Sequence, residues 1–335
     1  MKPLNINDIA KAAGVGKSTV SRVLQGQNHV SPDARARIES TIRELGYQPN
    51  MVASGLRKRR IQTIGLIIPD ISNPFFPEIT LGVQQVADER GYAVLLANSG
   101  WSNDREEDLV ALAQRQRLDG MIINPVHISL AALRAFGHSV VVIGTRAAYR
   151  EFDAVGSNTA ESVQLALAHL HALGHIHILA LPGPRGQDST RNREAAIYTA
   201  MQARPDKLPQ IHYCEFTKSG GYDAVAALLS LTPRPTAVLC GNDLIAIGML
   251  AGLRERGITV PGQISVVGID DIELASVCCP TLTTVHKPKR EMGMTAANML
   301  IDRIEGNIQS PPQMKKMSTH LVIRESTAAV GISSG

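Results

Sequence analysis

Residues 5–24 read NINDIAKAAGVGKSTVSRVL, and this stretch decides the fold of the N-terminal part of the chain. Asn5 is placed to cap a helix, and Asp8 stands three residues later, as in a capping box. An apolar stripe follows at helical spacing, formed by Ile6, Ile9, Ala10 and Ala13. The turn 14–16 contains two glycines, which accept positive φ without steric cost. A second helix is expected from Lys17 to about Gln25.

A third helix completes this unit. Ser31 and Pro32 form a cap followed by proline at the first helical position, and Gly46 marks the end. It runs through Ile38, Ile42 and Leu45, and the second helix turns Val20, Val23 and Leu24 inward. Two short helices around a three-residue turn, braced by a third helix, predict an all-α helix-turn-helix headpiece.

The outer face of the second helix suits the major groove of DNA. It carries Lys17, Ser18, Ser21 and Arg22. Arg22 can bond guanine O6 and N7 together, and His29 with the amide-rich loop 25–28 can hold phosphates. An ordinary solvated helix face is the alternative. Charge favours DNA, because residues 1–60 hold eleven Lys and Arg against four acids, a balance of +7, while the whole chain has +4.

Gly16-Lys17-Ser18 also resembles the end of a nucleotide-binding loop. That motif requires glycine five residues before Gly16, where Lys11 stands, and it requires a preceding strand. The sequence therefore argues against a phosphate-binding loop.

Composition limits the class of protein. A chain of 335 residues exceeds one ordinary core, and no apolar run approaches the length of a membrane span. The N-terminus lacks the apolar stretch of a secretory signal, so a cytoplasmic protein is expected. Four scattered cysteines without CxxC pairs predict reduced, buried thiols.

After the basic run 57–60, strand and helix patterns alternate, which predicts an α/β core of two doubly wound lobes. The expected strands are Ile64–Ile68, Tyr92–Ala97, Met121–Asn124, Val140–Ile143, Ile176–Leu181, Ile211–Glu215, Ala237–Cys240 and Ser265–Ile269. The expected helices include Pro77–Arg90, Arg105–Arg117, Leu130–Phe136 and Glu291–Glu305, the last of them packed on the first lobe. Ligands of such folds bind at the carboxyl ends of the strands.

Several motifs resemble the lactose/galactose repressor family over essentially the whole chain. They are Asp8-Ile9-Ala10, Ala13-Gly14-Val15, Thr19-Val20-Ser21-Arg22-Val23-Leu24, Val30-Ser31 and Leu45-Gly46-Tyr47-Gln48-Pro49-Asn50. The resemblance implies a headpiece (1–49), a hinge helix (50–60) and a periplasmic-binding-protein-like core (61–335) that forms a homodimer. Within the core it implies a first lobe of about 61–157 and 288–317 and a second of about 158–287 and 318–328.

The family also implies DNA contacts beyond the second helix. Leu56 would enter the minor groove as a wedge, beside Arg57, although packing within a linker is the alternative for Leu56. Gly55 departs from the usual hinge pattern and weakens a helix there. The full set of implied DNA-binding residues is Asn5, Lys17, Ser18, Thr19, Ser21, Arg22, His29, Asn50, Ala53, Leu56 and Arg57.

The resemblance likewise implies an effector site in the cleft. Its residues are Phe75, Phe76, Arg146, Gln187, Ser189, Arg193, Phe216, Asn242 and Asp270. An aromatic face would cover a sugar or base, while Arg193 and Asp270 bond its polar atoms. For Phe76 and Asn242 a structural role is an equal alternative. Arg193, Asn242 and Asp270 each come after a predicted strand, where such folds bind ligands.

Two departures from the family bear on the ligand. Gly144 and Ser157 stand where relatives often carry acids, which makes the cleft around Arg146 and Arg193 more cationic. A sugar or sugar acid is therefore expected as effector. A purine effector, or a repressor that needs a co-repressor, is the alternative. A transport receptor is more distant, since it needs a signal peptide and no basic headpiece.

No metal, cofactor or enzymatic activity is expected. The histidines at 169, 171, 175 and 177 lie two residues apart in each pair and Gly174 separates the pairs, so they do not share one helix face. We also find no nucleophile beside a base. The sequence predicts a DNA-binding transcription regulator, a repressor, whose partners are operator DNA, a small-molecule effector and a second copy.

Overall fold

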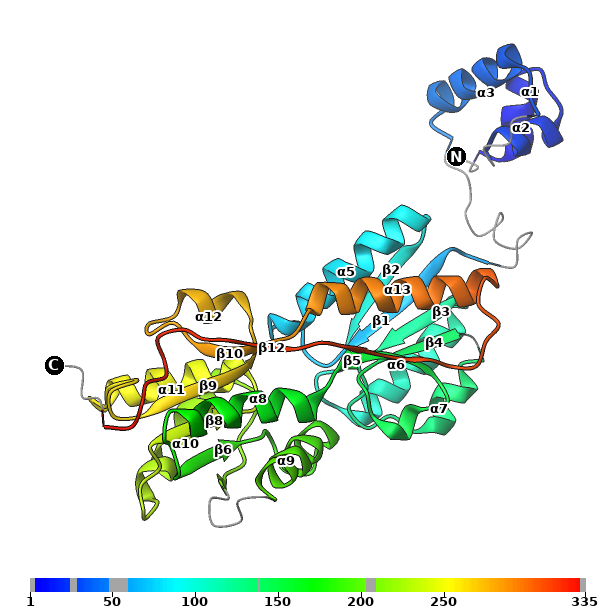
Figure 1. The fold of residues 1–335 in the computed structure, drawn as a ribbon. Helices are drawn as coiled ribbons and strands as arrows, with labels where there is room; N and C mark the ends of the chain where they lie inside the picture. Colours follow the sequence, from blue (N-terminus) through cyan, green and yellow to red (C-terminus); the bar gives the residue numbers. More distant parts are fainter. Residues whose placement is uncertain (1–3, 25–28, 48–59, 138, 203–208, 332–335) are drawn as a thin grey trace. The chain divides into compact units, whose positions relative to one another are not determined.

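The computed structural model describes residues 4–24, 29–47, 60–137, 139–202 and 209–331. The chain divides into two compact units, Met1–Gln62 and Thr63–Gly335, and each is considered by itself (Figure 1). Among the described residues, none of the helices is long and apolar enough to cross a lipid bilayer.

The first unit consists of helices α1 (Ile6–Ala12), α2 (Lys17–Leu24) and α3 (Pro32–Leu45). The predicted capping box is confirmed: Asn5 Oδ1 accepts from the Asn7 amide at 2.9 Å, and Asp8 accepts from the Asn5 amide at 2.8 Å. Ser31 caps α3, and Gly46 ends it with a φ of 61°. Local sequence chemistry therefore fixes the start of α1 and both ends of α3.

The headpiece has a small core of its own. Ile9, Val20 and Ile38 are fully buried, one from each helix, and Tyr47 closes the cluster after α3. Val23 is buried beside them. The predicted inward face of α2 is confirmed at Val20 and Val23, which leaves the opposite face of α2 toward solvent.

The second unit contains two six-stranded sheets. The first has the order β11-β5-β4-β3-β1-β2, with all its pairs parallel. Its strands are β1 (Thr63–Ile68), β2 (Ala93–Asn98), β3 (Gly120–Ile123), β4 (Ser139–Ile143), β5 (Asp153–Ser157) and β11 (Met314–Met317). We call this sheet with its helices the first lobe.

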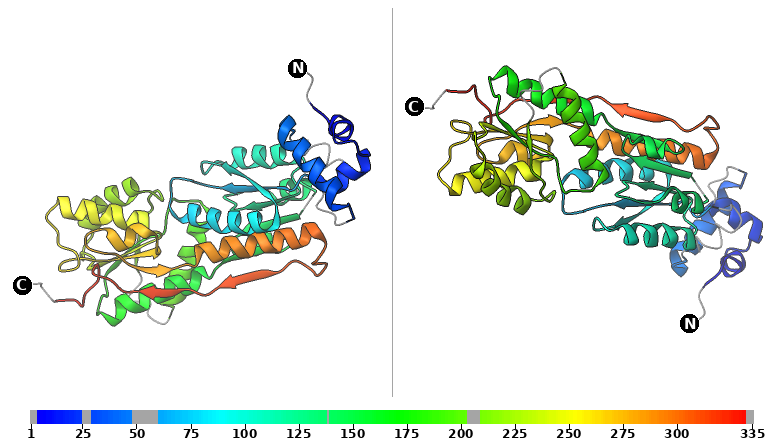
Figure 2. Two further views of the ribbon diagram at one scale, coloured as in Figure 1. Left: turned by 90° about the horizontal axis from the view of Figure 1, so that it is seen from above. Right: turned by 90° about the horizontal axis from the view of Figure 1, so that it is seen from below.

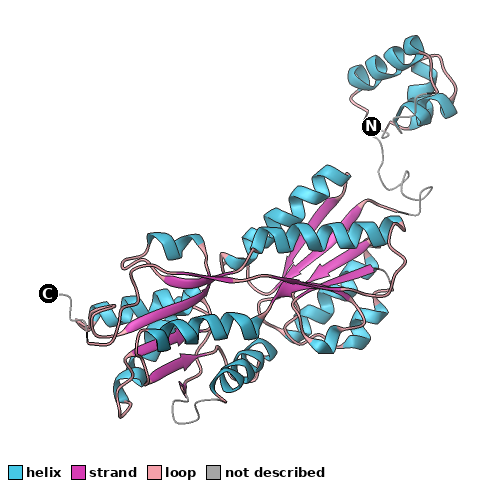
Figure 3. Cartoon of the chain, viewed as in Figure 1, coloured by secondary structure: helices cyan, strands magenta, loops and turns pink. Residues whose placement is uncertain are grey.

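The second sheet has the order β12-β10-β9-β8-β6-β7, and only β12 runs antiparallel to its neighbour. Its strands are β6 (Ile178–Leu181), β7 (Gln210–Ile211), β8 (Ala237–Cys240), β9 (Ser265–Asp270), β10 (Thr283–His286) and β12 (His320–Val322). This sheet and its helices form the second lobe. Figure 3 shows the strands of the two lobes in magenta, joined by the crossing segments.

Helices cover both sheets. The first lobe carries α5 (Phe75–Arg90), α6 (Asn103–Arg115), α7 (Leu130–Ala135), the short 3-10 helix η1 (Ala147–Tyr149) and α13 (Lys289–Glu305). The second carries α8 (Thr159–Ala172), α9 (Asp188–Met201), α10 (Lys218–Ser230), α11 (Asp243–Glu255) and α12 (Glu273–Val277). Both lobes are therefore helix-covered parallel sheets, as the alternating pattern predicted.

Helix α13 packs beside α5 on the first lobe (Figure 2), which confirms that prediction. Glycines permit the contact. A Cβ on Gly82 would lie 2.1 Å from the carbonyl oxygen of Arg290, and one on Gly293 would lie 2.1 Å from that of Ile79. The chain thus returns from β10 to the first lobe.

The predictions were wrong in detail at several places. Only Gln210 and Ile211 form β7, so the expected strand at 211–215 ends early. Helix α5 begins at Phe75 rather than Pro77, and β5, β10, β11 and β12 were not predicted. Polar residues or glycine interrupt β5, β10 and β11, which read DAVGS, TTVH and MKKM, and β12 has only three residues, so none of the four presents a continuous apolar run although β5 and β10 are buried.

Candidate nucleic-acid interface and ligand cleft

The outer face of α2 is open to solvent. Lys17, Ser18 and Arg22 are exposed, and Thr19 and Ser21 are half-buried. The helix contains no acid, whereas α1 and α3 hold the four acids of the headpiece. A cationic helix face with hydroxyl groups beside it is what a major groove requires.

Of the other predicted DNA-binding residues, the structure describes only two. His29 is exposed, and Asn5 is exposed with its side-chain oxygen already engaged as the cap of α1. Asn50, Ala53, Leu56 and Arg57, like Gly55, lie outside the described residues, so the hinge stays a prediction from the sequence.

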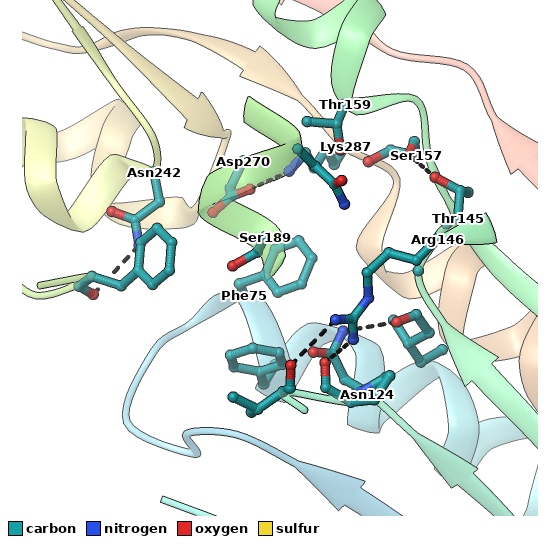
Figure 4. Close-up of a pocket in the computed structure, with 18 of the residues that line it drawn as sticks. Phe75, Asn124, Thr145, Arg146, Ser157, Thr159, Ser189, Asn242, Asp270 and Lys287 are labelled. Atoms are coloured by element: carbon teal, nitrogen blue, oxygen red, sulfur yellow. Dashed lines mark hydrogen bonds and ion pairs between the residues drawn. The ribbon is translucent and has the colours of Figure 1, made fainter. Parts of the chain in front are cut away.

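A cavity of about 150 Å³ lies at the strand ends of the two lobes (Figure 4). All nine predicted effector-binding residues line it: Phe75, Phe76, Arg146, Gln187, Ser189, Arg193, Phe216, Asn242 and Asp270. It is also lined by residues that the sequence analysis did not single out, among them Asn73, Trp101, Asn124, Thr159, Asn192 and Lys287. The fold therefore brings the predicted set together; the role of each residue in binding stays a prediction.

One wall of the cavity is a row of aromatic rings. Phe75 and Phe76 meet edge-on at 5.2 Å, Phe76 lies 6.3 Å from Trp101, and Trp101 lies 5.5 Å from Phe216 across the cleft. Gly183 makes room for Phe216, because a Cβ there would lie 2.2 Å from its ring. Such a wall offers a flat apolar face to a ring-shaped ligand.

Arg193 projects from α9 at the side of this wall. Its guanidinium carbon lies 5.0 Å from the centre of the Phe216 ring, and Nη1 donates to the Ser189 carbonyl at 3.2 Å. Burial lowers the pKa of Arg193 from its ordinary value, and the charge of Asp270 opposes part of that shift. An arginine remains protonated in any protein site, so Arg193 brings a positive charge to the cavity.

Asp270 ends β9 with a φ of 127°, in a region that L-residues rarely adopt. Lysines from the crossing segment hold it there. Lys287 Nζ donates to Asp270 Oδ1 at 2.9 Å, and Lys289 Nζ donates to the carbonyl oxygens of Asp270 and Asp271 at 2.6 and 2.8 Å. The carboxylate at the strand end is thus fixed and already paired.

Both polar atoms of the Asn242 side-chain amide form hydrogen bonds within the protein. Its oxygen accepts from the Ile245 amide at 2.9 Å, which caps α11, and its nitrogen donates to the Phe216 carbonyl at 3.4 Å. The next residue, Asp243, is buried below the cavity, where burial and then the charge of Asp270 raise its pKa to about 7. The structural alternative that the sequence left for Asn242 therefore has direct support.

Arg146 differs from the expectation of an unneutralised cation. It lies after β4 in the first lobe, and its Nη1 contacts Asp188 Oδ2 of the second lobe at 2.6 Å. It also donates to the carbonyl oxygens of Pro125 and Val126. The sequence analysis missed Asp188, whose position before Ser189 gave no sign of a partner 42 residues away.

Neighbouring cations keep the Asp188 carboxyl ionised in this contact. Burial acts to raise the pKa of Asp188, but the hydrogen bond from Arg191 and the charges of Arg146 and Arg191 outweigh it and lower that pKa. On the first lobe, buried Glu106 accepts from the Val126 and His127 amides at 2.7 and 3.0 Å. Glu106 thereby fixes the loop that receives Arg146.

One polar atom at the cavity is unsatisfied. Gln187 Oε1 is buried, and it has no hydrogen-bond partner among the described residues. A buried acceptor of this kind favours a ligand that donates a hydrogen bond.

His169 and His175 bond other groups of the second lobe. His175 bonds Thr236 Oγ1 at 2.9 Å and the Ala328 carbonyl at 3.0 Å, and His169 bonds Thr327 at 2.9 Å. In the part of the chain that the structure describes, no cluster of three metal-ligating side chains occurs. The cysteines are unpaired, and Cys279 is exposed, so the expectation of uniformly buried thiols was wrong.

Comparisons with known proteins agree with this architecture. Residues 5–50 match the family model for bacterial regulatory proteins of the lacI family, and residues 167–327 match the periplasmic binding protein-like domain. The repressor PurR of Escherichia coli O139:H28 is 34% identical over 334 residues, with 96% of each chain covered.

Solved structures extend the likeness. The lac repressor dimer bound to operator and the anti-inducer ONPF has a TM-score of 0.86 at 28% identity, over 98% of this chain and all of that one. A complex of the transcriptional regulator CelR with cellobiose has a TM-score of 0.72 at 30% identity, over 96% of this chain and 99% of that one.

A helix-turn-helix headpiece joined to a two-lobed core with a ligand-sized cavity defines a class of ligand-responsive DNA-binding regulators. The chain belongs to the lacI family of bacterial regulatory proteins and is a DNA-binding transcriptional repressor of that family.

Proposed function

We propose that this repressor binds a near-palindromic operator as a homodimer and that a sugar or sugar acid in the cleft controls its affinity for DNA. In this proposal α2 of each headpiece enters the major groove, and residues 50–60 form the hinge, with Leu56 in the minor groove. The observation that carries it is the pairing of an exposed cationic α2 with a polar and aromatic cavity in one chain. The operator-bound lac repressor dimer supports this arrangement.

The chemistry of the cavity supports a sugar. Its aromatic row provides a flat apolar surface, and Arg193, Gln187 and Asn124 provide polar groups beside it. A sugar ring offers an apolar face together with hydroxyl groups that both donate and accept. The regulator CelR, similar over almost the whole chain, is bound to cellobiose.

A purine is the second candidate. Relatives named PurR are 34% identical to this chain, and a planar base would also stack on Phe216 or Trp101. Under either ligand the repressor acts in the bacterial cytoplasm, where its DNA lies.

Thermal unfolding of the full chain separates these candidates. Sugars, sugar acids and purine bases are each added, with and without operator DNA selected from random duplexes. We expect a sugar or sugar acid to raise the melting temperature by mass action and to change operator affinity. Stabilisation by purines alone would replace the sugar with a purine, and failure to select any DNA would contradict the operator proposal.

A further inference from the structure

The charges around the cavity do not cancel. Of the described residues that line it, Arg146, Arg193 and Lys287 are cationic, and Asp270 is a carboxylate. The charged groups come from both lobes and from the segment that crosses between them (Figure 4). Their partners decide what charge a ligand meets.

Two of the three cations are neutralised by the protein. Lys287 Nζ lies 2.9 Å from Asp270 Oδ1, with 9% of one side chain and 7% of the other exposed. Arg146 pairs with Asp188 at 2.6 Å. The Lys287–Asp270 pair is largely shielded from water, whereas Asp188 is 28% exposed and also contacts the exposed Arg191. Both Arg146 and Lys287 nevertheless have a carboxylate partner.

Arg193 is the remaining cation. Its Nη1 bonds a neutral carbonyl of Ser189, and the face of its guanidinium lies over Phe216. Among the residues that the structure describes, no carboxylate forms an ion pair with it. One positive charge is therefore left at the cavity wall, and a shielded charge without a counterion is costly.

Lys287 creates this imbalance. Asp270 is the only carboxylate among the described residues that line the cavity, so it is the group available there to balance Arg193. Lys287 holds Asp270 instead, with the Phe75 ring 5.5 Å from its Nζ. The segment that carries Lys287 is itself fixed, because Lys289 donates to the carbonyl oxygens of Asp270 and Asp271.

We propose that the effector carries a single carboxylate, which Arg193 binds, and that Lys287 is the specificity residue that selects for it by neutralising Asp270. The inference rests on the proposed function and names its ligand class, a monoacid derived from a sugar. A neutral sugar leaves Arg193 without a counterion, whereas one carboxylate balances the site with a charge-assisted hydrogen bond. Gln187 Oε1 accepts from a hydroxyl of the same ligand.

Calorimetric titration of the full-length protein with matched pairs tests this. The pairs are D-galactose with D-galacturonate and D-glucose with D-glucuronate, in each of which a carboxylate replaces the C6 hydroxymethyl group of the same sugar ring. We expect at least one acid to bind about tenfold or more tightly than its neutral partner, since the two differ by one charge near Arg193. Neutral partners that bind as tightly as the acids would overturn the inference and leave the sugar proposal standing.

Substitutions then test whether Lys287 causes the preference for the acid over the neutral sugar. Lys287→Gln removes the charge and keeps a hydrogen-bond donor on a slightly shorter side chain, and we expect the acid-to-neutral affinity ratio to fall about tenfold. Lys218→Gln is the matched control, because it removes the same charge from an exposed position on α10. An unchanged ratio in Lys287→Gln would overturn the role of Lys287.

A second variant shifts the ratio the other way. Asp270→Asn leaves Lys287 unneutralised, so the preference for the acid should increase, and asparagine tolerates the positive φ at this position. This result remains decisive if Lys287→Gln does not fold. A fall of the ratio in Asp270→Asn would contradict the charge argument, and a panel in which no sugar or acid binds would contradict both this inference and the proposed sugar effector.

Discussion

Arg146 Nη1 and Asp188 Oδ2 lie 2.6 Å apart and join the two lobes across the ligand cleft. Arg146 is oriented entirely from the first lobe, by two backbone carbonyls and by the Tyr149 ring, which lies 4.8 Å below its guanidinium. Asp188 is the first residue of α9 in the second lobe. The contact therefore links the two lobes, and we expect it to act as a latch that favours the closed arrangement.

Asp188→Asn should loosen this latch. Water screens the pair, because 28% of the Asp188 side chain is exposed. We therefore expect the substitution to reduce the free energy that favours the closed arrangement of the lobes by about 1 kcal/mol. Distances between spin labels on the two lobes should broaden in the ligand-free protein. Asp223→Asn removes the same charge from an exposed site on α10 and should leave the distances unchanged; equal behaviour of the two variants would remove the latch from the account.

The buried carboxyl of Asp243 predicts a dependence of stability on pH. Its folded pKa of about 7 lies above the ordinary 3.8, so the folded state keeps a proton that the unfolded state has lost. Stability should fall as pH rises from about 4 to 7 and level off above 7. Asp243 accepts from the Ile272 amide and from the Thr284 hydroxyl. Asp243→Asn keeps the acceptor for the Ile272 amide and places an amide N–H opposite the Thr284 hydroxyl, so its melting temperature should decline less over that range. Parallel curves for both proteins would contradict the raised pKa.

Much of the fold follows from local sequence signals. The caps of α1 and α3 depend on Asn5, Asp8, Ser31 and Gly46, each within a few residues of the helix that it ends, and all four were predictable. Buried strands such as β1 and β9 are continuous apolar runs. By contrast, β11 reads MKKM and is exposed, so its place at the sheet edge depends on pairing with β5.

The residues that line the cavity were predictable by resemblance, but their ion-pair partners were not. Trp101 meets Phe216 only because the lobes face each other, and 115 residues separate them in the chain. Lys287 and Asp188 acquire their roles from ion pairs over 17 and 42 residues. No local pattern encodes such pairs, so the charge balance of the cavity emerged only from the structure.

Removal of the Arg22 side chain tests the base-reading helix. Arg22→Ala should relax sequence preference and weaken specific binding by roughly 1–3 kcal/mol, because a bidentate contact to guanine would be lost. Arg43→Ala removes the same charge from an exposed position on α3. Selection from random duplexes should then return the wild-type site for Arg43→Ala and a degenerate position for Arg22→Ala. Identical selected sites would exclude Arg22 from base recognition.

The stability of the headpiece should depend on its caps. Ser31 accepts from the Ala34 amide at the start of α3, so Ser31→Ala should destabilise this unit by about 1 kcal/mol. Circular dichroism of the full chain should show that the headpiece unfolds at a lower temperature, while the unfolding temperature of the core is unchanged. Ser31→Asn, which retains a capping oxygen, should behave like the wild type, and a loss equal to that of alanine would argue against capping.

The central claim is that ligand in the cleft controls binding of DNA by the headpiece. The most direct test is fluorescence anisotropy of a selected operator, titrated with the full-length protein at zero and at saturating concentration of the ligand found by calorimetry. The account predicts that operator affinity changes by at least about fivefold and that operator changes ligand affinity by the same factor. Equal operator affinity with and without bound ligand would contradict it.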